Sequence, residues 1–383
     1  MAERPGRKNA AVLVGLDFGD EGHGESLEEL RLLVESSGLK PLALIQGKRQ
    51  RPDSALFAGS GKTEEVAAAV REHGATVVVF NHELSPAQQR NLEKKLECPV
   101  LDRTGLILGI FAQRARSHEG KLQVELAQLE YASTRLVRGW THLERQRGGG
   151  GFLGGMGETQ IEIDRRLIGK RVKLLKDKLV QFKRRRDVQR RARTRGEVLS
   201  VSLVGYTNAG KSTLFNMLTH AGSYTADQLF ATLDTTTRRM YLEGAGNLVL
   251  SDTVGFIRDL PHGLVASFRA TLEETVHADL LLHVVDASSS VRDSQIAAVN
   301  AVLAEIGADA IPQILVWNKI DLTPLIPGLE RNEYGKICRV SLSAKTGAGL
   351  DILRTALAEV AAAKKSADTN RELEHSHKDT YVT

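Results

Sequence analysis

Residues 205–212 read Gly-Tyr-Thr-Asn-Ala-Gly-Lys-Ser, which is the spacing of a phosphate-binding loop. The apolar stretch 198–204 predicts a strand before the loop, and residues 213–218 predict a helix after it. A strand, a glycine-rich turn and a helix N-terminus present backbone N–H groups to a polyphosphate. In such a loop the lysine, here Lys211, contacts the β- and γ-phosphates, and the hydroxyl of Ser212 ligates Mg²⁺.

Three later segments decide which base the site accepts. Residues 252–255 (Asp-Thr-Val-Gly), 318–321 (Asn-Lys-Ile-Asp) and 343–345 (Ser-Ala-Lys) each follow an apolar stretch typical of a strand. The Asp321 carboxylate can accept hydrogen bonds from N1–H and N2–H₂ of guanine, and a site with unmet polar groups rejects adenine, which lacks both donors. Backbone N–H groups of 343–345 can lie near guanine O6. Four such turns in this order, each at the end of a strand, predict a guanine-nucleotide domain.

We therefore predict a nucleotide site made of the phosphate-binding loop, a metal-binding strand end and two base-binding loops. Lys211 and the backbone N–H of Gly255 are the expected contacts of the γ-phosphate. Ser212 and Asp252 are the expected metal ligands, Asp252 through water. The full set is Gly205, Tyr206, Thr207, Asn208, Ala209, Gly210, Lys211, Ser212, Thr213, Asp252, Thr253, Val254, Gly255, Asn318, Lys319, Ile320, Asp321, Ser343, Ala344 and Lys345.

The composition is ordinary for a globular protein. The 383 residues suffice for two or three domains, and 42% of them are hydrophobic and 26% charged. Cys98 and Cys338 fall in separate predicted domains without metal-like spacing, which favours a reducing, cytoplasmic compartment. We find neither the apolar core of a signal peptide at the N-terminus nor a stretch long enough to span a membrane.

Residues 10–115 alternate between stretches typical of strands and of helices. Such alternation predicts a small parallel α/β domain. Strands are expected at 11–16, 41–45, 76–80 and 99–101, and helices at 26–34 with a Ser26 cap, at 62–73, after Ser85-Pro86 and from Thr104.

Two long helices are expected between this domain and the nucleotide domain. Apolar residues recur at alternating spacings of four and three from Leu122 to Leu143, and a second seam runs from Ile168 to Phe182. Between them, residues 148–157 include seven Gly. The two helices should therefore form an antiparallel hairpin with a glycine-rich tip.

The net charge of +5 is distributed unevenly. Residues 165–195, in the second arm of the hairpin, contain fifteen Lys or Arg against two Asp, whereas the rest of the chain is mildly acidic. This excess favours RNA phosphates as the partner of the arm over the alternative of a merely solvated helix face. At the tip, Phe152, Leu153 and Met156 are either linker residues or contacts to an RNA surface.

The expected fold class is α/β: a small N-terminal parallel α/β domain, a long antiparallel helical hairpin, and a P-loop GTPase domain of the Ras-like type. The predicted boundaries are 1–115, 116–196 and 197–363. Residues 364–383, mostly polar and charged, are expected to form a disordered tail.

This combination of parts resembles the HflX family of translation-associated GTPases. The resemblance is carried by the four nucleotide motifs, by 230–234 (Phe-Ala-Thr-Leu-Asp), by 252–257 (Asp-Thr-Val-Gly-Phe-Ile) and by 157–166 (Gly-Glu-Thr-Gln-Ile-Glu-Ile-Asp-Arg-Arg). It spans about residues 10 to 363. It implies binding to the large ribosomal subunit and a role in splitting stalled ribosomes. We further expect a monomer that contacts the rRNA of this subunit and whose GTP hydrolysis is stimulated by ribosomes. The resemblance also adds Phe230, Ala231, Thr232, Leu233 and Asp234 to the site, with Thr232 as the switch threonine over Mg²⁺ and the γ-phosphate.

Two residues bear on the rate of hydrolysis. Phe256 stands where many GTPases have a water-positioning Gln, so unassisted hydrolysis should be slow; it can also be a buried aromatic, and the two interpretations are compatible. Asn208 stands in the pattern Gly-x-x-Asn-x-Gly-Lys-Ser, which resembles the loop of potassium-stimulated GTPases. Its carbonyl could help to hold K⁺ beside the phosphates, or it could simply form the turn.

Residues 59–63 (Gly-Ser-Gly-Lys-Thr) look like a second phosphate-binding loop, but Leu56 stands where the full pattern needs Gly. A helix start is the preferred interpretation. Weak ATP binding by the N-terminal domain stays open because the family is associated with ATP.

Rival functions are a nucleotide-switched scaffold for a protein or membrane partner, and a ribosome-assembly GTPase. An enzyme that modifies RNA is disfavoured because the sequence shows no nucleophile or metal constellation for it. His262, His277 and His283 have no ligand spacing and are expected at the surface or in the core.

Overall fold

The computed structural model describes residues 9–19, 22–136, 160–194, 198–219, 229–244, 246–258, 272 and 274–379. This part of the chain divides into two compact units within one long helix, between Gln181 and Phe182. None of the helices in these ranges combines the length and the apolar character needed to cross a membrane.

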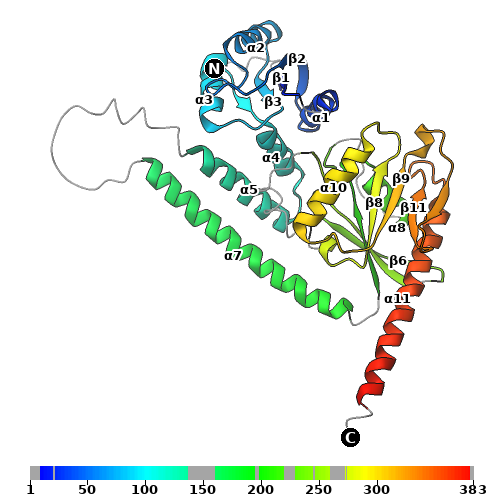
Figure 1. Cartoon of the computed structure of the whole chain (residues 1–383). Coiled ribbons are helices and arrows are strands. Elements are labelled where there is room, and N and C mark those ends of the chain that lie inside the picture. The colour runs from blue at the N-terminus through cyan, green and yellow to red at the C-terminus, as the bar shows by residue number, and fades with distance from the viewer. Residues whose placement is uncertain are drawn as a thin grey trace, which may run out of the picture. The chain divides into compact units, whose positions relative to one another are not determined.

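The N-terminal unit contains a four-stranded parallel sheet in the order β2-β1-β3-β4 (Figure 1). The inner strand β1 is buried along nearly its whole length, as expected for a parallel sheet covered by helices. The predicted parallel α/β domain is therefore confirmed. Its elements are β1 (Ala10–Asp17), α1 (His23–Ser36), β2 (Lys40–Lys48), α2 (Ser60–His73), β3 (Val77–Phe80), α3 (Pro86–Leu96), β4 (Val100–Leu101) and α4 (Arg103–Arg114).

Two helix starts in this unit bear on the predictions. Helix α1 begins at His23, so the predicted Ser26 cap is wrong: Ser26 lies in the first turn, where its hydroxyl accepts a hydrogen bond from Asn81 Nδ2 at 2.9 Å. Helix α2 begins at Ser60, directly after Gly59, and the Thr63 hydroxyl donates to the Gly59 carbonyl at 2.7 Å. Residues 59–63 are thus a helix start, as preferred.

The buried carboxylate of Asp102 caps α4 and anchors the next helix, α5 (His118–Leu136). It accepts hydrogen bonds from the backbone N–H of Gly105 at 2.7 Å and from the Tyr131 hydroxyl at 2.6 Å, and it pairs with Arg135. A buried carboxylate needs such partners, because a charge removed from water is costly unless hydrogen bonds or an ion pair compensate it. These contacts hold α5 against the start of α4.

Helices α5 and α7 (Gln160–Thr194) lie side by side (Figure 1). Arg171 and Lys176 of α7 pair with Glu125 and Glu130 of α5 at 2.7 and 2.8 Å. The continuation of the first helix beyond Leu136 and the glycine-rich tip at 148–157 lie outside the described residues. Buried leucines of the two predicted apolar seams are Leu122, Leu126 and Leu175.

The second unit contains a seven-stranded sheet in the order β10-β11-β9-β8-β5-β7-β6. The five strands between the edges are parallel, and the edge strands β10 and β6 are antiparallel to their neighbours. Its elements are β5 (Leu199–Val204), α8 (Lys211–Thr219), β6 (Thr236–Leu242), β7 (Gly246–Asp252), β8 (Leu280–Asp286), α10 (Arg292–Ile306), β9 (Gln313–Asn318), η1 (Ile320–Leu322), β10 (Gly328–Arg331), β11 (Ile337–Ser341) and α11 (Leu350–Asp379).

The topology of this sheet brings the predicted motifs together. Helices α8 and α11 pack on one face through an apolar core, and α10 packs against β8. Because the inner strands run the same way, their carboxyl ends share one edge, where ligands of open α/β sheets bind. The loops after β5, β7, β9 and β11 carry the four motifs to this edge.

The last helix, α11, reaches Asp379, whereas we predicted a disordered tail from residue 364. Residues 350–379 contain neither Gly nor Pro and are rich in Ala, Leu, Glu and Lys. These residues favour helix, so a polar composition alone does not end it. The helix therefore ends later than the predicted boundary.

Candidate nucleotide-binding site

The loop between β5 and α8 requires glycine at two positions. Gly205 has a φ of 144°, and a Cβ there would lie 2.2 Å from the carbonyl oxygen of Val284 in β8. Gly210 has a φ of 94°, and a Cβ there would lie 2.2 Å from Asn318 Nδ2. Between them Asn208 has a φ of 60°, a left-handed conformation that Asn tolerates. The predicted loop therefore requires glycine at these two positions, because Val284 and Asn318 approach its backbone closely.

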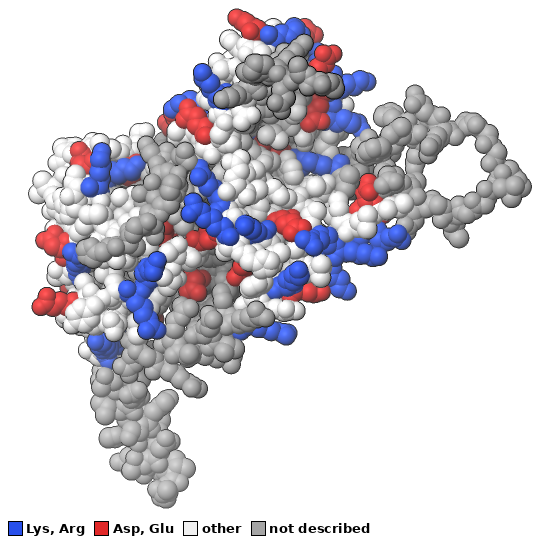
Figure 2. Space-filling view, turned by 180° about the vertical axis from the view of Figure 1, so that it is seen from behind, with Lys and Arg blue, Asp and Glu red and all other residues white. Residues whose placement is uncertain are grey.

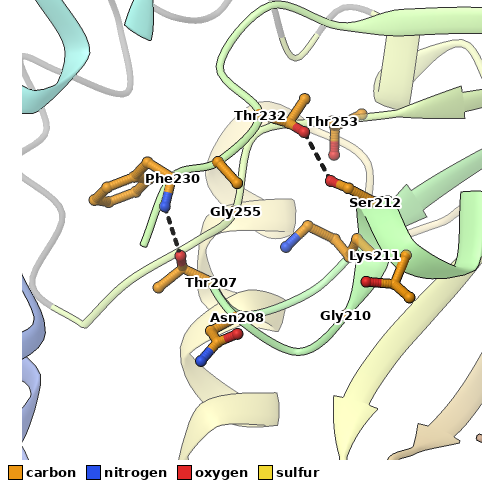
Figure 3. Close-up of a pocket in the computed structure, with 11 residues that line it drawn as sticks. Thr207, Asn208, Gly210, Lys211, Ser212, Phe230, Thr232, Thr253 and Gly255 are labelled. Carbon is orange, nitrogen blue, oxygen red and sulfur yellow. Dashed lines mark hydrogen bonds between the residues drawn. The ribbon is translucent and has the colours of Figure 1, made fainter. Parts of the chain in front are cut away.

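Lys211 is a buried cation whose side chain points into the pocket (Figure 3). Its Nζ donates to the carbonyl oxygens of Gly205 and Tyr206 at 3.0 and 2.8 Å. Burial lowers the pKa of Lys211 to about 8, and attraction to Asp252 acts in the opposite direction. A buried ammonium held by neutral carbonyls is suited to receive an anion.

Three oxygen-bearing side chains meet beside this lysine. The Ser212 hydroxyl lies 2.7 Å from that of Thr232, as Figure 3 shows, and 2.6 Å from Asp252 Oδ2. The Thr232 hydroxyl donates to the same Oδ2 at 3.0 Å. Burial raises the pKa of Asp252, and its Oδ1 is buried without a hydrogen-bond partner in the part of the chain that the structure describes. Such an all-oxygen set can hold a hard divalent cation.

The segment 230–234 lies against the phosphate-binding loop. The Phe230 N–H donates to the Thr207 hydroxyl at 3.0 Å (Figure 3), and the Phe230 side chain is buried. A φ of 56° at Phe230 turns the chain at this point. The anchored turn places Ala231 and Thr232 on the pocket wall.

The chain after β7 also approaches the loop closely. A Cβ on Gly255 would lie 2.8 Å from Thr207 Cα. The Phe256 N–H donates to the Gly205 carbonyl at 3.2 Å, and the Phe256 carbonyl accepts from the Thr207 N–H at 2.7 Å. The Phe256 side chain is buried, which confirms its interpretation as a buried aromatic.

The two predicted base-binding loops are joined to the phosphate-binding loop by one side chain. Asn318 Nδ2 donates to the Ala209 carbonyl, and Asn318 Oδ1 accepts from the Ala344 N–H, both at 2.8 Å. The Ser343 hydroxyl donates to Asp321 Oδ1 at 2.6 Å. The sequence suggested Asp321 as a contact of the base but not this bridging role of Asn318.

The structure brings eleven of the predicted residues to one pocket and places others behind it. Tyr206, Leu233 and Val254 are buried and support the loops. The base-binding loops do not line this pocket but reach it through Asn318. The lining consists of Thr207, Asn208, Gly210, Lys211, Ser212, Thr213, Phe230, Ala231, Thr232, Thr253 and Gly255.

Two supporting residues, Arg258 and His283, were given no role from the sequence because no motif marks them. The Tyr206 hydroxyl accepts a hydrogen bond from the Arg258 N–H at 2.7 Å and so holds the chain after Phe256. His283 lies in β8 with 1% of its surface exposed. Burial lowers the pKa of His283 to about 4, so this histidine is neutral in the folded protein.

Comparison with known proteins decides the family. The GTPase HflX of Escherichia coli (strain K12) is 56% identical over 360 residues, which cover 94% of this chain and 84% of that protein. The chain belongs to the HflX family of GTPases. The GTPase HflX of Magnetococcus marinus is 52% identical over 331 residues, which cover 86% of this chain and 76% of that relative.

Three family models match consecutive parts of this HflX-family chain. They are described as GTP-binding GTPase N-terminal (residues 24–112), GTP-binding GTPase Middle Region (114–193) and 50S ribosome-binding GTPase (200–319). A crystal structure of SsGBP in complex with GDP has a TM-score of 0.53, covers 92% of this chain and 98% of that chain, and at 23% identity shows the shared fold. The chain is a GTP-binding protein that hydrolyses GTP.

His283 makes the stability of the GTPase domain depend on pH. The folded histidine has a pKa of about 4, whereas the unfolded one takes up a proton near the ordinary value of 6.5. The stability is therefore complete above pH 6.5 and is lost as the pH falls from 6.5 toward 4, by up to about 3 kcal/mol. Urea unfolding at several pH values, followed by Trp317 fluorescence in a Trp140→Phe background, measures this loss.

The matched control for this prediction is a histidine at the surface. His283→Gln should flatten the pH dependence between 6.5 and 4, whereas His73→Gln, at an exposed position, should leave it unchanged. The same slope in His283→Gln and in the parent protein would assign the acid sensitivity to other groups.

Proposed function

We propose that this HflX-family GTPase acts in the cytoplasm, binds the large ribosomal subunit through its rRNA, and splits or rescues stalled ribosomes. The observation that carries the proposal is the basic helix α7, which precedes a GTPase domain that matches the family described as 50S ribosome-binding. RNA is the polyanion that such a helix would meet on a ribosome.

Lys and Arg side chains gather along α7 on the face shown in Figure 2. At about 1.5 Å per residue, the 35 residues of α7 extend roughly 52 Å. Cations spaced along such a helix can follow a phosphate backbone, and their release of counterions makes binding steeply salt-dependent. Exposed cations of α7 are Arg165, Arg166, Lys170, Arg171, Lys173, Lys176 and Arg184.

The geometry of the pocket supports a Mg²⁺-dependent reaction. Ser212, Thr232 and Asp252 would hold the ion, Asp252 through water. The buried Oδ1 of Asp252, which has no hydrogen-bond partner among the described residues, fits this donor set. When bound, Mg²⁺ neutralises charge that develops on the phosphate oxygens. Lys211 would exchange its carbonyl partners for the β- and γ-phosphate oxygens, and the Gly255 N–H would contact the γ-phosphate.

The pocket lacks one usual element of GTP hydrolysis in the part that the structure describes. Phe256, which follows Gly255, is buried and cannot orient an attacking water with its side chain. The isolated protein should therefore hydrolyse GTP slowly. The rate of hydrolysis should increase when a ribosome supplies or orders a group that positions the attacking water. GTP hydrolysis with and without purified large subunits tests this link.

Guanine selection is assigned to Asp321, whose carboxylate the Ser343 hydroxyl orients. Asp321→Asn would turn an amide donor toward guanine N–H donors, and should cost about 2–4 kcal/mol in GTP binding while favouring xanthosine nucleotides. Titration with fluorescent nucleotides measures the change. Asp309→Asn, an exposed control in the same domain, should bind GTP as the parent does; equal affinity in Asp321→Asn would remove this residue from base recognition.

Potassium should accelerate hydrolysis more than sodium if the Asn208 carbonyl helps to hold a monovalent cation beside the phosphates. Rates in matched KCl and NaCl, with and without ribosomes, test the effect. Asn208→Gly is the matched variant, because Gly tolerates the φ of 60° while removing the carbonyl. Loss of the potassium effect in this variant supports the role, and equal rates in both salts of the parent protein reject it.

The tip and the basic arm should have separable roles in splitting. Deletion of residues 149–156 is expected to leave GTP binding intact but to abolish splitting of ribosomes, measured by light scattering or sedimentation. Arg184, Arg185 and Arg186 changed to Glu should weaken ribosome binding itself, because like charges repel rRNA phosphates.

A charge-matched control distinguishes a specific role of the basic arm in ribosome binding from an effect of the protein's net charge. The control variant carries Glu in place of Arg71, Lys94 and Lys336, which are exposed positions away from α7. It has the same net charge as the arm variant and should bind ribosomes normally. Splitting at the normal rate by the loop deletion would make the tip a connector. Binding to anionic vesicles without binding to ribosomes would favour a membrane scaffold instead.

A further inference from the structure

A carboxylate outside the nucleotide motifs contacts the middle of the guanine-binding segment. Asp286 is the last residue of β8, and β8 pairs with β9 so that Asp286 lies beside Asn318. Its Oδ2 lies 2.7 Å from Nζ of Lys319. We propose that Asp286 is a positioning residue for guanine recognition, which holds the Lys319 side chain so that its methylene stem forms a wall of the base site.

The Asp286 carboxylate is itself held in one orientation. Its Oδ1 accepts hydrogen bonds from the N–H of Ser288 at 3.0 Å and from the Ser288 hydroxyl at 2.6 Å. This leaves Oδ2 directed at Lys319. An acceptor fixed by two hydrogen bonds restrains a long side chain better than a freely rotating carboxylate, because less side-chain entropy remains to be lost on binding.

The backbone of Lys319 favours the same arrangement. Lys319 has a φ of 64°, so the chain leaves β9 with a sharp turn and the lysine reaches back to the end of β8. Its neighbour Asn318 is held by Ala209 and Ala344, and Asp321 is held by Ser343. Every polar side chain of the segment 318–321 therefore has a partner before a base arrives.

The ion pair between Asp286 and Lys319 is not needed to hold the end of β8 in place. The side chains of Lys319 and Asp286 are 26% and 20% exposed, so each charge keeps some contact with water when its partner is removed. The end of β8 is in any case tied to β9, since the Ala287 N–H donates to the Asn318 carbonyl at 2.9 Å. The effect of Asp286 should therefore be seen in nucleotide affinity rather than in stability.

The inference rests on the proposed base site at 318–321, and a double-mutant cycle tests it. GDP affinity is measured by titration of a fluorescent GDP for the parent, Asp286→Asn, Lys319→Met and the double variant. Asp286→Asn should weaken GDP binding by about tenfold, because an unrestrained lysine must be ordered on binding. In the Lys319→Met background the same change should have less than about a twofold effect, since it acts through the lysine.

Further readouts separate positioning from damage to the fold. Asp286→Asn should raise KM for GTP by about tenfold while kcat changes less than about twofold, as expected for lost ground-state and transition-state binding alike. Asp286→Glu should recover part of the affinity. Asp293→Asn is the matched control, because Asp293 is 91% exposed on the first turn of α10 and should bind GDP as the parent does.

The outcomes distinguish this inference from the base site on which it rests. If Lys319→Met weakens GDP binding but Asp286→Asn does not, the positioning role is wrong and the base site stands. If Asp286→Asn weakens binding equally in both backgrounds, the residue acts on the fold and the inference is overturned. If neither Lys319→Met nor Asp321→Asn changes affinity, the base site itself is misplaced.

Discussion

The side-chain amide of Asn318 is the contact on which the rest of the site depends. It donates to Ala209 and accepts from Ala344, so one buried group joins the phosphate-binding loop to the base-binding loops. Gly210 must lack a side chain because this amide occupies the place of a Cβ. A buried polar group left without its partner costs about 1–3 kcal/mol. The loops therefore support one another's geometry before nucleotide binds.

Around this joint the site contains charges that the protein compensates only in part. Lys211 and Asp252 are both buried. Burial lowers the pKa of Lys211 and raises the pKa of Asp252, and both shifts favour the neutral form. Such burial opposes folding unless hydrogen bonds offset it, as the carbonyls around Lys211 and the hydroxyls around Asp252 do. A polyphosphate would bring the missing opposite charge to Lys211, and a divalent cation would bring it to Asp252. The same arrangement that limits stability thus favours binding.

The motifs could be predicted from the sequence because phosphate and base contacts demand fixed residue types at fixed distances from strand ends. The strand–loop–helix order around Lys211 is local, and so is the Ser85-Pro86 pair that predicted the start of α3. The contacts of His283, Tyr206 and Asp286 join residues far apart in the chain, and no short pattern encodes them. The predicted start of α1 and the predicted end of α11 were wrong for a related reason. A residue type that can cap a helix, such as Ser26, and a polar composition determine helix ends less strongly than the helix propensity and packing of the surrounding residues.

The position of Phe256 connects packing with control of the reaction. Its backbone ties the end of β7 to Gly205 and Thr207, and its ring is buried, so this position stiffens the phosphate-binding loop instead of orienting water. In the part of the chain that the structure describes, this feature fits the proposal that a partner stimulates hydrolysis. Helix α7 ends at Thr194, only a few residues before β5 leads into that loop. If RNA binds along α7 as we propose, this short connection would be a physical route from RNA contact to hydrolysis.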